Sequence, residues 1–300
     1  MPLSADTLLD RLHLKAQLMR WRLATIFVLV MATVALFERG GGHSPIEHSF
    51  IARVTIDGVI LDDMKRDTLM ADIRDNNKIK AVIVRLDTPG GSAVAGMELY
   101  RELRAIAEKK PVVAVMRDVS ASAGYLTAVG SDRIFAREGT LTGSIGVIIE
   151  SAEFTGLAEK LGITPITIKT GPLKDALAPT SKVSPEAIAA MQSVVDDFFQ
   201  VFIDTVAERR QMARADVVKL ADGRVFTGRQ AVKNGLIDAI GNEEDAISWL
   251  EKNKKVPEKL DVRDMKPKKD DIPLLDKFTG TLFQKFSPSG AGALDGLVAI

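Results

Sequence analysis

The chain has 300 residues, of which 46% are apolar, a size and composition that suit one large folded core and exclude a disordered chain. Its 40 basic and 40 acidic side chains cancel, and no basic stripe alternates with aromatic residues, so nucleic-acid binding is set aside. The chain has no cysteine, which excludes disulfides, thiol nucleophiles and thiolate metal sites.

The N-terminal region predicts a membrane anchor. Residues 23–37 carry no charge and follow a basic segment, residues 1–22. At 1.5 Å per residue they span about 23 Å, less than the roughly 30 Å of a bilayer core, and Trp21 with its neighbouring arginines extends that length. The positive flank predicts a cytoplasmic N-terminus and a body outside the inner membrane. A buried core helix and a cleavable signal peptide, with its cleavage site at residues 33–35, are the alternatives.

After a linker at residues 38–49, the chain alternates short apolar runs with helical patterns. The run "IARVTIDGVI" predicts a strand pair or hairpin, and residues 81–87 predict a near-continuous apolar strand. Residues 95–110 form an amphipathic helical pattern. Further strands are predicted at "PVVAVM", "RIFA" and "ITPITI". The alternation predicts βαβ units and an α/β body over residues 50–250.

A long helix is predicted from Ser184, with Pro185 in its first turn. Its apolar stripe, typical of a core or subunit contact, consists of Ile188, Met191, Val195, Phe198, Phe202 and Val206. Residues 251–300 are charged and proline-punctuated at first, which predicts a connector with one short strand and a C-terminal extension.

Histidine is confined to His13, His43 and His48, so the predicted body contains no imidazole. A Ser-His-Asp triad and a His-Glu-x-x-His zinc site are therefore excluded from the body. A nucleophilic serine in this chain needs a lysine or a carboxylate as its base.

The stretch "DVSASAGYLTA" offers Ser122 as a nucleophile, with Ser120 as a competitor that we expect to cap the following helix. Lys174, in "TGPLKDALAP", has apolar neighbours and is the first candidate for the base, and Lys169 is the second. Lowering a lysine pKa from about 10.4 to about 7 requires destabilising the ammonium by about 4–5 kcal/mol. We therefore expect Asp175 to point away from Lys174.

The stretch "DTPGGS", residues 87–92, follows a predicted strand and precedes a predicted helix. Its glycines allow a backbone N–H to face a ligand at close range, although an ordinary strand–helix turn has the same composition. The GK[ST] ending of a phosphate-binding loop is absent.

Five stretches, in order "DTPGGS", "SASAGYLTA", "LTGSIGV", "GPLKDALAP" and "DGRVFTGRQAVKNGLIDAIG", resemble the signal peptide peptidase A family, peptidase family S49. The similarity covers about residues 50–250. The resemblance implies a serine peptidase without cofactor or metal, with Ser122 as nucleophile and Lys174, 52 positions later, as general base. It also implies that Ser144 orients the base and that the Gly91 and Ala123 N–H groups form the oxyanion hole.

The same resemblance implies a ClpP/crotonase-like spiral of βαβ units, ring- or dome-shaped homo-oligomers, and hydrophobic peptides such as released signal peptides as substrates. In a short, single-repeat chain, Ser122 and Lys174 then meet within one subunit or across a subunit boundary. Two departures from the family pattern, Ala123 after the serine and Leu173 before the lysine, affect substrate preference. An acyl-CoA enzyme and a non-catalytic member of the fold are the alternative functions.

Overall fold

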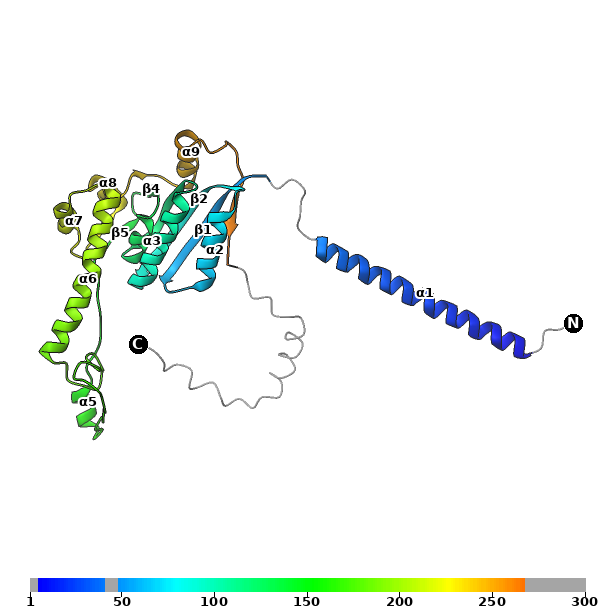
Figure 1. Cartoon of the computed structure of the whole chain (residues 1–300), viewed down its shortest axis with the longest axis horizontal. Helices are drawn as coiled ribbons and strands as arrows, with labels where there is room; N and C mark the ends of the chain where they lie inside the picture. Colours follow the sequence, from blue (N-terminus) through cyan, green and yellow to red (C-terminus); the bar gives the residue numbers. More distant parts are fainter. Residues whose placement is uncertain (1–4, 41–47, 268–300) are drawn as a thin grey trace. The chain divides into compact units, whose positions relative to one another are not determined.

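The computed structural model describes residues 5–40 and 48–267 and divides into two units, Met1–His48 and Ser49–Ile300. The first unit contains one helix, α1 (Ala5–Gly40), drawn in dark blue in Figure 1. Among the described residues, no helix is both long and apolar enough to cross a membrane, so the predicted transmembrane helix is not confirmed. The side chains of residues 33–37, the end of the predicted anchor, lie outside the described residues, as do residues 41–47 of the linker.

The second unit is built on a sheet of eight strands, which confirms the predicted α/β class. The strands are β1 (Phe50–Ile60), β2 (Ile79–Gly91), β3 (Val112–Ala121), β4 (Arg133–Ala136), β5 (Leu141–Gly143), β6 (Val225–Thr227), β7 (Ala239–Ile240) and β8 (Val262–Met265). Their order is β6-β5-β3-β2-β1-β8, with β4 paired to β3 and β7. All described pairs are parallel except β5 with β6.

The central strands are apolar on both faces because each face of the sheet is covered. Along β2, Val82 and Val84 belong to one buried cluster and Ala81 and Ile83 to a second. Helices α2 (Met64–Asp75), α3 (Ala93–Ala107) and α4 (Ala123–Ala128) contribute to the first cluster, and α9 (Glu243–Lys254) contributes to the second. Alternating side chains of a strand point to opposite faces, so a strand covered on both sides reads as a continuous apolar run.

The predicted long helix is α6 (Pro185–Arg210), and its start is fixed by a cap. The Ser184 side chain accepts a hydrogen bond from the Ala187 N–H at 3.1 Å, and Pro185 occupies the first turn. Short helices α5 (Thr155–Lys160), α7 (Arg214–Leu220) and α8 (Gly228–Lys233) flank it in the sequence. In Figure 1, α5 lies beside the N-terminal end of α6, away from the strands.

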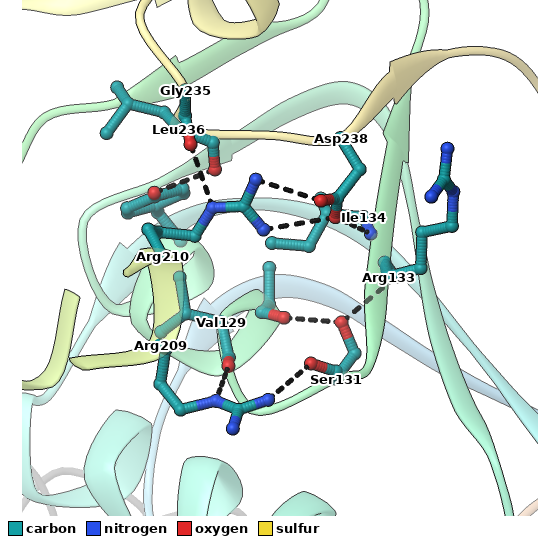
Figure 2. A network of polar contacts seen from close by, with 11 residues as sticks. Val129, Ser131, Arg133, Ile134, Arg209, Arg210, Gly235, Leu236 and Asp238 are labelled. Carbon is teal, nitrogen blue, oxygen red and sulfur yellow. Dashed lines mark hydrogen bonds and ion pairs between the residues drawn. The ribbon is translucent and has the colours of Figure 1, made fainter. Parts of the chain in front are cut away.

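Two arginines fasten the C-terminal end of α6 to the body, as Figure 2 shows. Arg209 donates to the backbone carbonyls of Val129 and Ser131, both at 3.0 Å, at the end of α4. Arg210 forms a bidentate ion pair with Asp238, in which both N···O distances are 3.0 Å. Burial is the main cause that lowers the pKa of Arg209, followed by the nearby charge of Arg104. Because this end of α6 is held against α4, the helix keeps a fixed place beside the loop that begins α4.

Two of the predictions about strands are wrong. The run "IARVTIDGVI" is one strand rather than a hairpin, because the chain does not turn back at Gly58, at φ 68°, and stays paired with β2 on both sides of it. The register shifts there, with one residue more in β2 between Asp87 and Gly90 than in β1 between Asp57 and Val59. Residues 163–168, "ITPITI", form no strand, and among the described residues no strand pairs with them. The short strand predicted in the connector is confirmed as β8, and residues 268–300 of the predicted extension lie outside the described residues.

Candidate active site

Ser122 stands at the junction between β3 and α4 in an unusual backbone conformation. Its φ is 53° and its ψ is −122°, a region that costs a non-glycine residue about 1–3 kcal/mol. Its N–H donates to the Gly143 carbonyl at 2.9 Å, and its own carbonyl accepts from Leu126 at 2.9 Å. Ser122 makes no side-chain cap of α4, so its hydroxyl is not used to begin the helix.

A cleft of about 500 Å³ opens beside Ser122. It is formed by the end of β2 with Ser92, by α3, α4 and α6, by the chain after β5, and by Gly223 before β6. Its large apolar side chains are Met97, Leu126, Val147, Ile148, Phe198, Val201 and Phe202. The cleft is therefore suited to apolar groups of a ligand.

The C-terminal end of β2 packs against Ser122, and only glycine fits there. A Cβ on Gly90, at φ 112°, would lie 2.8 Å from the Ser122 Cβ. A Cβ on Gly91, at φ 153°, would lie 2.1 Å from the Ile60 carbonyl oxygen. Gly91 and Ala123 both line the cleft with Ser122, so the two residues predicted to donate to an oxyanion lie at the same cavity as the predicted nucleophile.

Ser144 is brought to the cleft by the pairing of β5 with β3. Ala121 pairs with Gly143, so the residues that follow each of them, Ser122 and Ser144, are neighbours at the ends of adjacent strands. Ser144 has φ 48°, and its N–H donates to the Arg224 carbonyl at 2.9 Å. Four of the five predicted site residues thus line one cleft.

Lys174, the fifth, does not line the cleft. It is exposed in a turn, and its amine has no hydrogen-bond or ion-pair partner among the described residues. Asp175 bonds instead to Lys169 and Ser181, as expected for a carboxylate directed away from Lys174. The Lys169 hydrogen bond is the main cause that lowers the pKa of Asp175. This ion pair occupies the amine of Lys169, the competing candidate for the base.

Ser120 has a different place from the one expected. It lies within β3 opposite Thr88, is fully buried, and its hydroxyl has no hydrogen-bond partner in the described part of the chain. The predicted capping role is therefore wrong. Because Ser120 is enclosed by the sheet and Ser122 faces the cleft, the structure separates the two competing serines.

The contributions of α3 and α6 to the cleft were not identified from the sequence. Met97 and Arg101 lie one turn apart on α3, and Asp197 and Phe198 lie on α6. The apolar stripe of α6 indicated a contact surface but not which part of it faces a cavity. In residues 5–40 and 48–267, no group of three or more His, Cys, Asp or Glu side chains is placed to hold a metal ion.

Comparison with known proteins shows which family the chain belongs to. Residues 104–257 match the family model described as peptidase family S49. A protease-related protein of Synechocystis sp. is 41% identical over 66% of this chain and 72% of its own length. A protein of Enterococcus faecium named after signal peptide peptidase SppA is 38% identical over 69% of this chain and 64% of its own. The chloroplastic serine protease SPPA of Arabidopsis thaliana is 38% identical over 62% of this chain and 28% of its own.

The fold is also shared with a solved structure. A membrane-bound stomatin-specific protease aligns with a TM-score of 0.50 at 20% identity, over 74% of this chain and all of its own. This likeness concerns the fold, whereas the sequence relatives and the family model concern ancestry. The chain therefore belongs to peptidase family S49 and is a serine peptidase of that family.

Proposed function

We propose that the protein is a membrane-anchored serine endopeptidase that cleaves hydrophobic peptides, released signal peptides among them, with Ser122 as its nucleophile. The observation that carries the proposal is the position of Ser122. It is held in a strained backbone at a strand–helix junction and lines a cleft with apolar walls. Strained backbone conformations concentrate at functional sites. Here the strained residue is Ser122, whose hydroxyl makes no capping hydrogen bond to α4.

The reaction assigns a role to each residue at the cleft. The Ser122 hydroxyl oxygen attacks the scissile carbonyl while the Lys174 amine accepts its proton. The Gly91 and Ala123 N–H groups donate to the oxyanion of the tetrahedral intermediate. Lys174 then gives the proton to the leaving amine, and water releases the acyl group from Ser122 by the reverse sequence. Ser144 holds the lysine amine in place by a hydrogen bond.

Within one chain Lys174 lies outside this cleft, so we propose that it completes the Ser122 site of a neighbouring subunit in a ring- or dome-shaped homo-oligomer. The segment that carries Lys174, residues 148–184, exposes apolar side chains, with Ile166 at 87% and Ile168 at 98%. Exposed apolar surface on this scale is typical of protein–protein contacts. Burial of the amine between subunits also removes water from its charged form, which a neutral base requires.

The anchor and the architecture complete the proposal. Leu23, Phe27 and Val30 of α1 are exposed, and exposed apolar side chains gathered in this way mark a membrane or protein contact. We place residues 23–37 across the inner membrane and the body on its periplasmic side, following the positive flank at residues 1–22. The succession of parallel βαβ units is the one that a ClpP/crotonase-like spiral requires.

The test uses the full-length protein in detergent or nanodiscs and an apolar fluorogenic peptide. We expect Ser122→Ala and Lys174→Ala to lower kcat/KM by about a thousandfold or more, with the oligomer size unchanged. Lys169→Ala is the matched control, because that lysine lies in the same segment and we expect it to keep most of the activity. Near-normal turnover of Ser122→Ala contradicts the nucleophile, and near-normal turnover of Lys174→Ala contradicts the base.

A further inference from the structure

The residues that line the cleft include two charged side chains, Arg101 on α3 and Asp197 on α6. The rest of the lining consists of apolar side chains, glycine, alanine and serine. A charge in such a cleft loses part of its water when a peptide fills the space. The sign of that charge then decides which substrate side chains are accepted.

Asp197 is the one of these two charged residues that has no partner in the described part of the chain. Its carboxylate makes no hydrogen bond or ion pair within the described residues, and Phe198 and Val201 stand beside it on the cleft face of α6. Its neighbour Asp196 differs on both counts, because it accepts a hydrogen bond from Gln192 at 2.7 Å and does not line the cleft. Asp197, Phe198 and Val201 are exposed in the single chain, so a bound peptide can reach the unpaired carboxylate and place a cation beside it.

Arg101 is already partly engaged. Its guanidinium lies 3.6 Å from the Glu98 carboxylate, one turn earlier on α3, and both side chains are well exposed. An exposed pair of this kind contributes little energy. The two charges of the cleft therefore differ, with a weakly paired cation on α3 and an unpaired anion on α6.

We propose that Asp197 is a specificity-determining residue that selects apolar peptides carrying a lysine or arginine side chain near the scissile bond. This inference rests on the proposed function for the identity of the substrate as a peptide. Asp197 touches the substrate side chain and takes no part in the bond-breaking steps. A glutamate at the same peptide position is disfavoured by repulsion from Asp197.

The experiment uses full-length protein and a set of apolar octapeptides in which one position at a time carries lysine, norleucine or glutamate. Norleucine has the alkyl stem of lysine without its charge, so the lysine-to-norleucine ratio of kcat/KM isolates the charge. We expect this ratio to exceed one at a position that reaches Asp197 and to fall by about threefold to tenfold in Asp197→Asn. Asp197→Lys is expected to make glutamate the preferred residue, and Asp196→Asn is expected to leave the ratio unchanged.

A binding measurement separates this inference from the proposed function. The same peptides, labelled with a fluorophore, are titrated into Ser122→Ala and into the Ser122→Ala, Asp197→Asn double variant, so that no cleavage is needed. A preference for lysine that Asp197→Asn abolishes supports the inference, even if the wild-type protein cleaves nothing and the peptidase proposal fails. Equal affinity for all three peptides in both proteins, or an equal loss in Asp196→Asn, overturns it.

Discussion

The sheet body and the segment at residues 148–184 have opposite kinds of surface in the same unit. In the body, apolar residues such as Leu99, Leu103 and Ile83 are fully buried. In the segment, Ile166 and Ile168 are almost fully exposed, and α5 has no buried residue. The body carries Ser122 and the segment carries Lys174. In our proposal, the nucleophile therefore lies on a buried core and the base on an exposed surface that another subunit covers.

The body and the segment have similar local sequence patterns, and they differ in whether a neighbouring strand is present to pair with them. The strand at residues 81–87 and the run at residues 163–168 are both rich in β-branched residues. The first is paired on both sides, by β1 and β3, whereas the second has no strand partner among the described residues. A short strand is stable only when a neighbour satisfies its backbone groups, so the same pattern has two outcomes.

The largest effect on stability is expected for a glycine substitution in the body. Gly91→Ala places a Cβ 2.1 Å from the Ile60 carbonyl oxygen, with φ at 153°, and we expect it to lower the free energy of unfolding by about 4 kcal/mol. The control is Gly156→Ala in α5, where a Cβ meets nothing within 4 Å and alanine favours a helix. Urea titrations measure both. An equal effect of the two substitutions contradicts the contrast between the regions.

A smaller effect is expected from truncating apolar side chains. Leu103→Ala in the buried face of α3 is expected to lower the free energy of unfolding by about 3 kcal/mol. Ile166→Ala removes a side chain that is 87% exposed and is expected to leave the unfolding of the isolated subunit unchanged, while weakening subunit association. Thermal unfolding and sedimentation velocity provide the two readouts. Full retention of the oligomer in Ile166→Asp would remove this segment from the proposed interface.

The smallest effect concerns Glu102, a carboxyl group of the body with one buried oxygen that has no hydrogen-bond partner among the described residues. Burial, followed by the charge of Asp67, raises the pKa of Glu102 to about 7. The folded state therefore holds the proton more tightly than the unfolded state, whose carboxyl has a pKa of about 4.3. The free energy of unfolding falls as the pH rises from about 4.3 to about 7, because the folded state must then carry the buried charge.

The substitution Glu102→Gln removes that charge. After allowance for solvent screening, we expect it to stabilise the protein by about 1 kcal/mol at pH 8 and by almost nothing at pH 4. Glu108→Gln, at the exposed end of α3, is the control and is expected to show no such pH dependence. Urea titrations at the two pH values measure the difference. A Glu102→Gln effect of the same size at both pH values contradicts the assignment to titration.

The sequence predicted the elements whose formation depends on a few neighbouring residues. The cap at Ser184, the apolar strand at residues 81–87 and the amphipathic helix at residues 95–110 each carry their cause in a few neighbouring residues. The hairpin prediction for β1 failed because Asp57 and Gly58 suit a turn but also fit within a continuous strand, and only the presence of β2 alongside decides between the two. The same is true of Ser120, whose burial depends on its partner strands.

The candidate site divides in the same way. The resemblance of the motifs selected Ser122, Ser144, Gly91 and Ala123, and the strand register places all four at one cleft. The place of Lys174 is set by contacts beyond a single chain in our proposal, and a sequence pattern carries no such information. Asp197 and Phe198 were not predicted as cleft residues because the stripe of α6 continues unchanged from its exposed half to its buried half.

The central claim is that nucleophile and base come from different subunits, and subunit mixing tests it most directly. Ser122→Ala and Lys174→Ala chains, each inactive and each with its own affinity tag, are dissociated, mixed in equal amounts and reassembled. A site that joins the intact serine of one chain to the intact lysine of its neighbour predicts recovery of about a quarter of wild-type activity in doubly tagged oligomers. Complete inactivity of those oligomers would contradict the account.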